Sequence, residues 1–365
     1  MTAIDTVIIG AGPAGLAAAR GARSVGRSAL VIDENWSGGG QIWRGQAQQV
    51  EGVAFDFERQ VASLDELSYK RLILACGARE LFLPFPGWTL PHVTGAGGLQ
   101  ALVKNGLNVQ GKRVVIAGSG PLLLAVAANL AKAGAIVLLV AEQASWAKLS
   151  RFAFGLWRSP SKLAQGIELR NSKYRAGLWP VEAYEGSVKM SDGRRWSCDY
   201  LACGFGLTPN LELARHAGCA VEDGYVVVDE WQRTNVAGIY AVGEMTGIGG
   251  VEKAEAEGWA AGSGGRLQGE HGRFVKLLET SFALRSELRT LATPDTIVCR
   301  CEDVQFCKLD GLTGRRDAKL QTRCGMGACQ GRICGPILGF IQGWEVDRAR
   351  PPSVPVRVKD LCSKT

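Results

Sequence analysis

Histidine is scarce in this sequence, with only His92, His216 and His271 among 365 residues. None of them stands in a motif that positions a general base, so acid–base chemistry on a substrate is not indicated. The sequence also lacks any CxxC pair, and no pair of cysteines lies near its first glycine-rich turn. A disulfide reductase mechanism is therefore not indicated either. We assign no catalytic residue in this chain.

Signals for export and membrane insertion are also lacking. The N-terminal stretch MTAIDTVIIGAGPAG has no basic region, so we expect no secretory signal. The longest apolar stretch, residues 120–140, is interrupted by Asn129, Lys132 and Gly134. It predicts a helix, a turn and a strand rather than a transmembrane segment. We expect a reducing cytoplasm, where the eleven cysteines would serve metal binding or redox chemistry.

The charge balance bears on possible partners. The formal net charge is +7 and the isoelectric point is about 8.9, a modest basic excess. Basic and aromatic residues are not interleaved as they are in proteins that bind single-stranded nucleic acid, so we expect no nucleic-acid partner. Part of the excess lies in the last third, at Arg315, Arg316, Lys319, Arg323 and Arg332. These residues form either a docking surface or an ordinary solvated face.

The start of the chain has the pattern of a dinucleotide-binding unit. Residues 5–10 (DTVIIG) predict a buried strand, and GAGPAG (residues 10–15), an alanine-rich helix and a second strand ending at Asp33 follow. In this motif the glycines allow a tight turn, close approach of a pyrophosphate, and close packing of helix on strand. The helix N-terminus offers N–H groups to the phosphates. Asp33, with Glu34 as the nearest substitute, would accept hydrogen bonds from the ribose; an ordinary glycine-rich turn is the alternative.

Two further stretches indicate that the nucleotide is FAD. Residues 38–41 (GGGQ) form a backbone-rich loop suited to a flat ring system, and a strand pattern near residue 240 ends at Gly243 and Glu244 before a helix of small residues. This second arrangement resembles the second FAD signature of the two-dinucleotide-binding flavoproteins, in which the acid binds the ribityl chain. The predicted FAD site comprises Gly10, Gly12, Pro13, Ala14, Gly15, Asp33, Glu34, Gly40, Gln41, Gly243 and Glu244.

Two apolar stretches resemble the crossover strands of the same flavoproteins. They are LILACGARE (residues 72–80) and YLACGFGLTPN (residues 200–210). Cys76 and Cys203 stand within these strands, where we expect them to be small buried side chains.

The middle of the chain repeats the nucleotide-binding plan in an altered form. Residues 114–142 predict a strand, a glycine-rich turn, a helix and a strand, with Leu123 in place of the third glycine. A leucine there should hold the helix away from the strand and spoil the close cradle for a dinucleotide. Glu142 ends the second strand and no arginine cluster follows, which argues against NADP. This domain either binds NAD or another adenine nucleotide, or it serves only as a scaffold.

The last third carries cysteines at metal-binding spacing. Cys299 and Cys301 form a CxC pair, and CGMGACQGRIC adds Cys324, Cys329 and Cys334. A CxC pair, an interval of about twenty residues and a CxxxxC pair suit an iron–sulfur cluster held by four thiolates. Zinc sites prefer CxxC knuckles, so zinc and unligated cysteines are the alternatives. The pairs 324–329 and 329–334 have the same spacing, which therefore does not choose between them.

These motifs together resemble one family of bacterial flavoproteins. CRCEDV with GMGACQGRICGP resembles the ferredoxin-like 2Fe–2S module at their C-terminus. FPGWTLPHV, GSGPLLL and GIYAVGEMTGIGGVE resemble the flavoprotein subunits of opine oxidases, hydrogen cyanide synthase and hydroxyproline dehydrogenases, over nearly the whole chain. The resemblance implies that Cys329 and Cys334 join Cys299 and Cys301 as cluster ligands, and that Cys324 is spare.

The resemblance also implies a domain plan. The fold is α/β: a Rossmann-like FAD domain (residues 1–95 and 211–290) with an inserted, shortened NAD-like domain (residues 96–210). A 2Fe–2S module (residues 295–350) and a tail (residues 351–365) follow. Relative to the family, the segment between Arg44 and Leu72 is short, and we expect Val50–Phe55 to replace the strand that contacts the adenine of FAD.

The family implies a division of labour between subunits. A FAD-dependent partner subunit of the amino-acid oxidase type, in a complex that can include a small third subunit, oxidises an amino acid or opine. This chain then passes the electrons through FAD and the 2Fe–2S cluster to an acceptor. We expect it in the cytoplasm, or peripheral to the inner membrane where its acceptor lies there. A free-standing NADH-dependent reductase is the alternative, and a nonredox subunit whose cofactors serve assembly is a third hypothesis.

Overall fold

The computed structural model describes residues 4–158, 171–269 and 271–345, together with residues 166, 168, 352 and 356. The chain divides into two compact units, one formed by residues 1–79, 208–275 and 348–365 and the other by residues 80–207 and 276–347. The predicted tail, residues 351–365, lies outside the described residues except at two positions, as do the last five residues of the predicted 2Fe–2S module.

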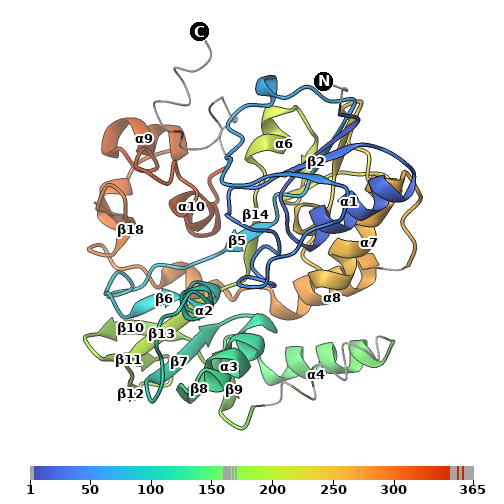
Figure 1. Cartoon of the computed structure of the whole chain (residues 1–365). Coiled ribbons are helices and arrows are strands. Elements are labelled where there is room, and N and C mark those ends of the chain that lie inside the picture. The colour runs from blue at the N-terminus through green and yellow to red at the C-terminus, as the bar shows by residue number, and fades with distance from the viewer. Residues whose placement is uncertain are drawn as a thin grey trace. The chain divides into compact units, whose positions relative to one another are not determined.

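The first unit is built on a five-stranded parallel sheet in the order β17-β4-β1-β2-β3, of which β2 is labelled in Figure 1. Its strands are β1 (Thr6–Ile9), β2 (Ala29–Ile32), β3 (Ala54–Asp56), β4 (Arg71–Leu74) and β17 (Ile239–Ala241). Its principal helices are α1 (Pro13–Ser24), α6 (Glu212–His216) and α7 (Gly250–Ser263). The sheet gains its edge strand, β3, at the end of the expected segment Val50–Phe55.

Alternate residues of these strands face opposite sides of the sheet, as the two-residue period of a strand requires. Ile8 and Ile73 pack with α1 and α7 in one buried cluster. Val7 and Leu72 pack in another cluster, which includes Leu213 of α6. Because both faces are covered, the strands are apolar at nearly every position, as is usual for parallel sheets.

Helices α1 and α7 approach each other through small residues. A side chain added at Gly258 would overlap the backbone of Ala14, and one added at Gly262 would overlap the backbone of Ala18. At Gly21 an added Cβ would lie 2.7 Å from the carbonyl oxygen of Trp259. The alanines and glycines that the sequence shows in both segments are therefore required by backbone-to-backbone packing.

The remaining elements of the first unit are short. They are the 3-10 turns η1 (Leu64–Glu66) and η3 (Gly243–Thr246), and the antiparallel pair β15 (Val221–Glu222) and β16 (Tyr225–Val226). Strands β5 (Ala78–Glu80) and β14 (Leu207–Pro209) form a two-stranded sheet at the residues where the chain leaves the first unit and returns to it. The chain enters the second unit again within α8 (His271–Phe282).

The second unit contains another five-stranded sheet, in the order β6-β13-β7-β8-β9. Its strands are β6 (Val93–Gly95), β7 (Arg113–Gly118), β8 (Ile136–Glu142), β9 (Tyr174–Ala176) and β13 (Tyr200–Gly204), with helices α2 (Ala96–Lys104), α3 (Leu122–Lys132) and α4 (Trp146–Gly155) and the turn η2 (Leu156–Arg158). An antiparallel sheet of β10 (Pro180–Tyr184), β11 (Ser187–Met190) and β12 (Arg195–Ser197) packs in the same unit. The expected strand, turn, helix and strand over residues 114–142 are confirmed.

The two faces of the second sheet are covered by different structures. Ile116 and Val140 pack with Leu99 of α2 and Leu123 of α3. The opposite face packs against Ala183 and other residues of the antiparallel sheet. Leu123, which replaces the third glycine of the motif, is fully buried, so it acts as a core residue of α3.

The cysteine-rich segment belongs to the second unit. It contains the turns η4 (Ser286–Thr290) and η5 (Phe306–Leu309), the strands β18 (Ile297–Cys299) and β19 (Val304–Gln305), and the helices α9 (Arg315–Thr322) and α10 (Cys334–Gln342). Its own small core includes Val298, Leu309 and Leu338. Ile337 packs instead in the hydrophobic core of the five-stranded sheet of the second unit, so α10 contacts two hydrophobic clusters.

Among the described residues, no helix is both long enough and apolar enough to cross a membrane.

Candidate functional site

The three glycines of the first turn have three different surroundings. A side chain at Gly10 (φ 107°) would overlap the backbone of Ala75, and one at Gly15 would overlap the backbone of Gly10. An added Cβ at Gly12, by contrast, would have no atom within 4 Å. Gly10 and Gly15 are thus required by packing, whereas Gly12 faces open space at the N-terminus of α1, where a pyrophosphate is expected.

Asp33 links the end of β2 to this turn. Its Oδ2 accepts a hydrogen bond from the backbone N–H of Ala11 at 2.5 Å, and its Oδ1 accepts from the backbone N–H of Asn35 at 2.8 Å. Asp33 is 8% exposed, whereas its neighbour Glu34 is exposed and accepts a hydrogen bond from Gln60. Of the two predicted ribose ligands, only Asp33 is therefore fixed against the glycine-rich turn.

The loop at residues 38–41 lies against the same turn. The backbone N–H of Gly39 donates to the carbonyl of Ala11 at 2.8 Å, and an added Cβ at Gly40 would lie 3.1 Å from Cα of Gly12. Gln41 is exposed and accepts a hydrogen bond from Arg44. The structure thus brings Gly40 to Gly12, as expected if both border one bound cofactor.

Gly243 and Glu244 complete this group from the other end of the unit. An added Cβ at Gly243 (φ 77°) would lie 3.0 Å from Cβ of Ala14. Oε1 of Glu244 accepts a hydrogen bond from the backbone N–H of Gly250 at 3.0 Å. Its Oε2 is buried and has no hydrogen-bond partner among the described residues, and burial raises the pKa of this carboxyl. A buried oxygen without a partner is costly, so it fits a site where a ligand hydroxyl supplies the hydrogen bond.

A buried ion pair beside Glu244 was not predicted from the sequence. Lys253 and Glu257, 5% and 4% exposed, are 2.8 Å apart between Nζ and Oε1. Lys253 also donates to the carbonyl of Gly243 at 2.9 Å, and Glu257 accepts from the N–H of Gly243 at 2.8 Å. The pair therefore fixes the turn that carries Glu244, and its only sequence signal is the i, i+4 spacing of opposite charges.

The glycine-rich turn of the middle domain is hydrogen-bonded to an acidic residue of the same domain, Glu142. Glu142 is fully buried, and its two oxygens accept hydrogen bonds from the backbone N–H groups of Gly120 at 2.7 Å and Ala144 at 2.8 Å. Burial raises the pKa of this carboxyl to about 7. Both oxygens of Glu142 are thus bonded to backbone N–H groups, as the oxygens of Asp33 are at the first turn.

Residues 282–285 also occupy the surroundings of this turn. Oγ of Ser119 donates to the carbonyl of Phe282 at 3.0 Å. Gln143, fully buried, donates from Nε2 to Oγ of Ser119 at 3.0 Å and accepts at Oε1 from the N–H of Arg285 at 3.2 Å. The segment is thus bonded to the turn and to the residue after Glu142, the two places where a dinucleotide would be held.

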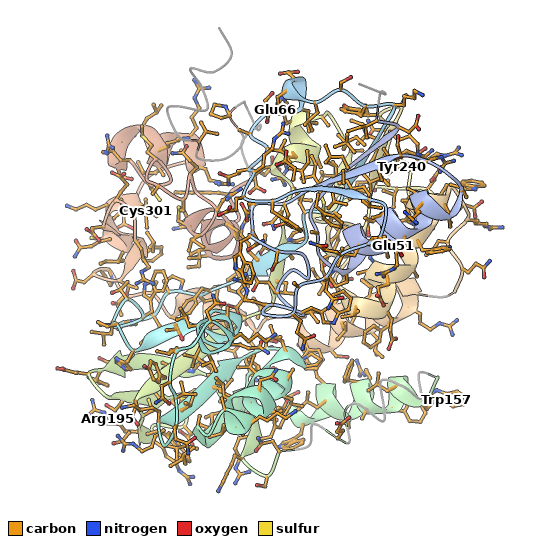
Figure 2. All side chains as sticks on the ribbon, in the orientation of Figure 1. Glu51, Glu66, Trp157, Arg195, Tyr240 and Cys301 are labelled. Atoms are coloured by element: carbon orange, nitrogen blue, oxygen red, sulfur yellow. The ribbon has the colours of Figure 1, made fainter. Side chains whose placement is uncertain are left out.

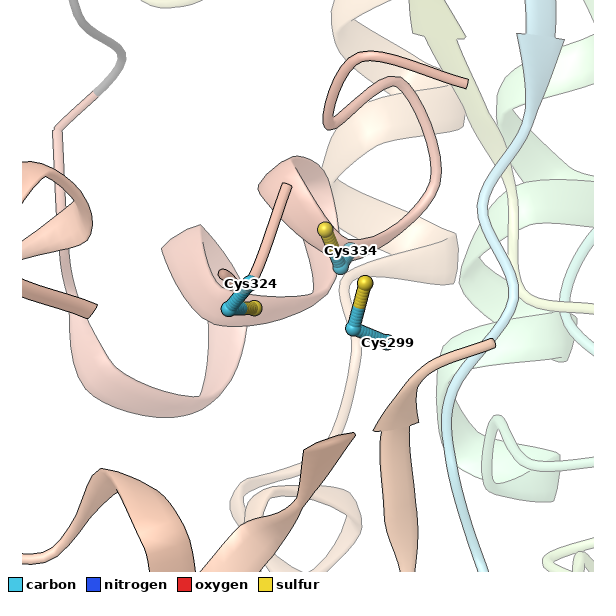
Figure 3. A group of neighbouring side chains, drawn as sticks. All are labelled: Cys299, Cys324 and Cys334. Atoms are coloured by element: carbon cyan, nitrogen blue, oxygen red, sulfur yellow. The ribbon is translucent and has the colours of Figure 1, made fainter. Parts of the chain in front are cut away.

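Three of the six cysteines of the predicted module (residues 295–350) converge (Figure 3). Cys299 at the end of β18, Cys324 after α9 and Cys334 at the start of α10 have their sulfur atoms all within 4.8 Å of one another. They are 1%, 4% and 2% exposed. Hydrogen bonds from Cys324 and Cys334 lower the pKa of Cys299 to about 2, so a thiolate is favoured there.

The other two predicted ligands form a separate pair. Cys301 is exposed (Figure 2) and Cys329 is half-buried. Backbone and thiol of Cys329 lie within hydrogen-bonding reach of the Cys301 thiol. The predicted ligands therefore fall into an inner pair, Cys299 and Cys334, and an outer pair, and Cys324 lies beside the inner pair.

The glycines between these cysteines allow the loop to wrap closely. A side chain at Gly327 would overlap Cβ of Cys301, and an added Cβ at Gly325 (φ 82°) would lie 3.8 Å from Sγ of Cys334. Backbone at such distances can direct N–H groups toward sulfur, as expected for a cluster site. Thiolate sulfurs grouped in this way fit iron or zinc, with iron–sulfur favoured by the CxC spacing.

Cys198 and Cys203 have the CxxxxC spacing seen in some redox pairs, but their surroundings do not suit that role. Both side chains are fully buried in the middle domain, and burial raises the pKa of Cys198 to about 11 and that of Cys203 also. Reactive cysteines require an accessible thiolate. The expectation of a small buried side chain is confirmed for Cys203, whereas Cys76 is only partly buried.

Comparisons of sequence connect the chain to flavin-dependent oxidoreductases. The profile of the pyridine nucleotide-disulphide oxidoreductase family matches residues 41–258, and that of NAD(P)-binding Rossmann-like domains matches residues 8–64. An opine oxidase subunit of Rhizobium meliloti is 30% identical over 93% of this chain and 92% of its own length. Hydrogen cyanide synthase subunit HcnB of Pseudomonas protegens is 28% identical over 91% of this chain and 90% of its own length.

Comparisons of structure agree on the fold. L-Proline dehydrogenase from P. horikoshii superposes with a TM-score of 0.66 at 21% identity, covering 98% of this chain and 79% of that chain. A ferredoxin reductase from Rhodopseudomonas palustris gives 0.55 at 22% identity, covering 73% of this chain and 77% of that chain. The predicted α/β fold of a two-dinucleotide-binding flavoprotein is confirmed, and so is the resemblance to opine oxidase and hydrogen cyanide synthase subunits.

Proposed function

This chain belongs to the pyridine nucleotide-disulphide oxidoreductase family, and from that premise we propose that it is an electron-transfer subunit. In this proposal it passes electrons from a partner flavin subunit, through its own FAD and a 2Fe–2S cluster, to an acceptor. The whole complex would be an amino-acid or opine dehydrogenase, or one of the hydroxyproline type. The chain is an FAD-dependent oxidoreductase, and the proposal concerns its place in a larger assembly.

The observation that carries the proposal is the convergence of Cys299, Cys324 and Cys334 on the same chain as a flavin cradle. Buried thiols at such short separations are a suitable set of ligands for iron. A flavin exchanges electrons in pairs or singly and a 2Fe–2S cluster exchanges them one at a time, so together they can connect a two-electron donor to a one-electron acceptor.

Residues of this chain would hold the flavin without acting on a substrate. The turn at residues 10–15 offers the N–H groups of α1 to phosphates beside the open space at Gly12. Oε2 of Glu244 would accept a hydrogen bond from a ribityl hydroxyl, and Lys253 and Glu257 keep Glu244 in place through Gly243. In the inner and outer pairs, Cys299, Cys301, Cys329 and Cys334 would ligate the cluster.

The names of the relatives support a partner chain. The opine oxidase and hydrogen cyanide synthase relatives are both named as subunits of larger enzymes. We propose, by the resemblance, that the partner of this chain is a FAD-dependent subunit of the amino-acid oxidase type, with a small third subunit in the same complex. The basic residues around the cysteines would then contribute a docking surface.

A free-standing NADH-dependent reductase is the second candidate, because the family name and the similarity in fold to a ferredoxin reductase favour it. The middle domain argues against it. NADH would have to displace residues 282–285 from Ser119 and Gln143. This displacement breaks hydrogen bonds that the protein already makes, and so lowers the affinity for the nucleotide.

Anaerobic reduction of the purified chain distinguishes the two functions. The chain is mixed with NADH alone, and separately with its FAD-dependent partner and a panel of amino acids, imino acids and opines. We expect the flavin absorbance of this chain to bleach only with the partner and one class of substrate. Rapid bleaching by NADH alone would establish the reductase instead, and no bleaching with any partner and substrate would reject a redox role.

A further inference from the structure

We propose that Cys324 is a reserve ligand of the cluster, able to take the place of Cys334 on iron. This inference rests on the proposed function, because it requires the cluster to be present. The predicted ligand set needs four thiolates, and the module contains six cysteines, of which five lie in the CxC pair and the CGMGACQGRIC stretch. The resemblance leaves Cys324 spare, but the structure places it beside the inner pair.

The distances carry the inference. Sγ of Cys324 lies within 4.8 Å of the sulfur atoms of both Cys299 and Cys334, and all three side chains are buried. An iron atom that binds Cys299 and Cys334 would therefore lie beside Cys324 as well. Cys301 and Cys329 lie next to each other, outside this group of three sulfurs. A third thiol is therefore within reach of the position that Cys299 and Cys334 would hold.

The loop between Cys324 and Cys334 allows either thiol to reach the same metal position. Cys329 is separated from each of them by the same number of residues. Gly325 (φ 82°) and Gly331 (φ 76°) reverse the chain, and an added Cβ at Gly325 would lie 3.6 Å from Cα of Gly331. The two ends of the loop therefore lie close together, and Cys324 and Cys334 lie side by side.

The exchange is balanced without any oxidant or reductant. Cys324 gives up its thiol proton and forms a sulfur–iron bond as the bond between iron and Cys334 breaks, and Cys334 takes a proton. The number of thiolates on iron, the charge of the site and the electron count are unchanged. Thiolate for thiolate is also a replacement of like by like, whereas a serine oxygen is a poor ligand for this metal.

A packing role is the alternative explanation of Cys324. Cys324 belongs to the same small apolar cluster as Val298 and Leu338, and a cysteine can occupy a core position as a small hydrophobic residue. The two explanations differ in what happens when Cys334 is removed. If Cys324 only packs, nothing replaces the lost ligand.

The test compares Cys324→Ser, Cys334→Ser and the double variant, prepared as the full chain under anaerobic conditions. Iron and acid-labile sulfide are counted, and electron paramagnetic resonance spectra are recorded on the reduced proteins. We expect both single variants to keep most of the wild-type iron and sulfide. Cys334→Ser should have shifted g values, because a different sulfur binds the iron. The double variant should lose the cluster by a factor of about ten or more.

Cys307→Ser is the matched control, since Cys307 is a half-buried cysteine of the same module outside the inner group. It should keep the wild-type spectrum. The corresponding alanine variants, with circular dichroism of each protein, separate a missing ligand from a failure to fold. A folded Cys334→Ser or Cys334→Ala protein without iron would overturn the inference and leave Cys324 a packing residue.

Two other results have separate meanings. A Cys324→Ser protein without iron beside a loaded Cys334→Ser protein would make Cys324 a fixed ligand, and this also overturns a reserve role. Wild-type protein that contains no iron or sulfide after anaerobic reconstitution would reject the proposed cluster itself. Failure of the inference and failure of the proposed function are thereby distinguished.

Discussion

Gly12 differs from the neighbouring glycines because a side chain added to it would meet no protein atom within 4 Å. We predict that Gly12→Val folds with little loss of stability but reduces FAD content by about tenfold or more, because the valine would occupy the space that the pyrophosphate requires. Flavin absorbance per chain after purification and after incubation with excess FAD measures the effect.

Gly272→Val is a suitable control for this change, since Gly272 in α8 also has nothing within 4 Å of an added Cβ. It should retain wild-type FAD content. Gly15→Ala should behave differently from both, because its Cβ would overlap the backbone of Gly10 and cost about 1–3 kcal/mol of stability. A Gly12→Val protein with full flavin content would show that the cofactor lies elsewhere.

Glu142 predicts a pH dependence of stability within the middle domain. Its carboxyl ionises near 4.5 in the unfolded chain, whereas burial raises the pKa to about 7 in the folded protein. Between these values the folded state holds a proton that the unfolded state has lost, so stability falls as pH rises through this range. We expect Glu142→Gln to remove this component, and therefore to gain stability relative to wild type between pH 5 and pH 8.

Thermal unfolding of wild type and variant at both pH values measures the difference. The absolute stability of Glu142→Gln can be lower at each pH, because a glutamine amide cannot accept the two hydrogen bonds from Gly120 and Ala144. The informative quantity is therefore the change between pH 5 and pH 8. Glu185→Gln, at an exposed carboxylate of the same unit, should leave the pH dependence unaltered. Equal pH dependence in wild type and Glu142→Gln would contradict the assignment.

At the scale of elements, the stability of α7 depends on a buried pair of opposite charges, Lys253 and Glu257. Lys253→Met would leave Glu257 buried without its counter-ion, and we predict a loss of about 3–5 kcal/mol. Lys253→Met combined with Glu257→Gln should recover part of this loss, because no unpaired charge remains. Denaturant unfolding of the single and double variants provides the measurement.

Arg20 and Glu255 offer a comparison between the same two helices. They form an exposed ion pair of α1 and α7 at 3.3 Å, so Arg20→Met should cost less than about 1 kcal/mol. The comparison of Lys253→Met with Arg20→Met tests how burial affects the loss of stability, since each change removes the basic residue of an ion pair. If Lys253→Met and the double variant were equally unstable, the buried pair would not be the source of the loss.

The elements of the fold were predictable because their signals are local. The strand, turn and helix over residues 5–24, and their repeat over residues 114–142, follow from apolar runs and glycine spacing within short segments. The approach of Gly40 to Gly12, and of Gly243 to Ala14, is a long-range contact that only the family resemblance indicated. The strand expected within Val50–Phe55 forms only at its end, over Ala54–Asp56, where three residues pair with β2.

The features that were not predicted are contacts between distant positions. Nothing in the local sequence indicates that Phe282 accepts a hydrogen bond from Ser119, which lies 163 residues earlier. Similarly, the spacing of Cys324 from Cys329 does not reveal that Cys324 lies beside Cys299. Such contacts depend on how packed elements bring loops together, and a single sequence carries no periodic signal for them.

At the scale of the whole molecule, the two proposed cofactor sites belong to different compact units. The residues around Gly12 and Glu244 are all in the first unit, and the cysteines of residues 299–334 are all in the second. Because each unit has its own sheet and hydrophobic core, loss of one cofactor need not unfold the other site. Flavin content and iron content should therefore respond separately to mutation.

Reductive titration of the intact protein tests this independence and the cofactor content together. A flavin takes up two electrons and a 2Fe–2S cluster takes up one, so anaerobic titration with dithionite should end at about three electrons per wild-type chain. Gly12→Val should end at about one electron because it lacks flavin. Cys301→Ser should end at about two, because Cys301 is a proposed ligand outside the group of three sulfurs that contains Cys324. An end point of about two electrons in wild type would show that no cluster is present, and a loss of both cofactors in either variant would show that the sites are coupled.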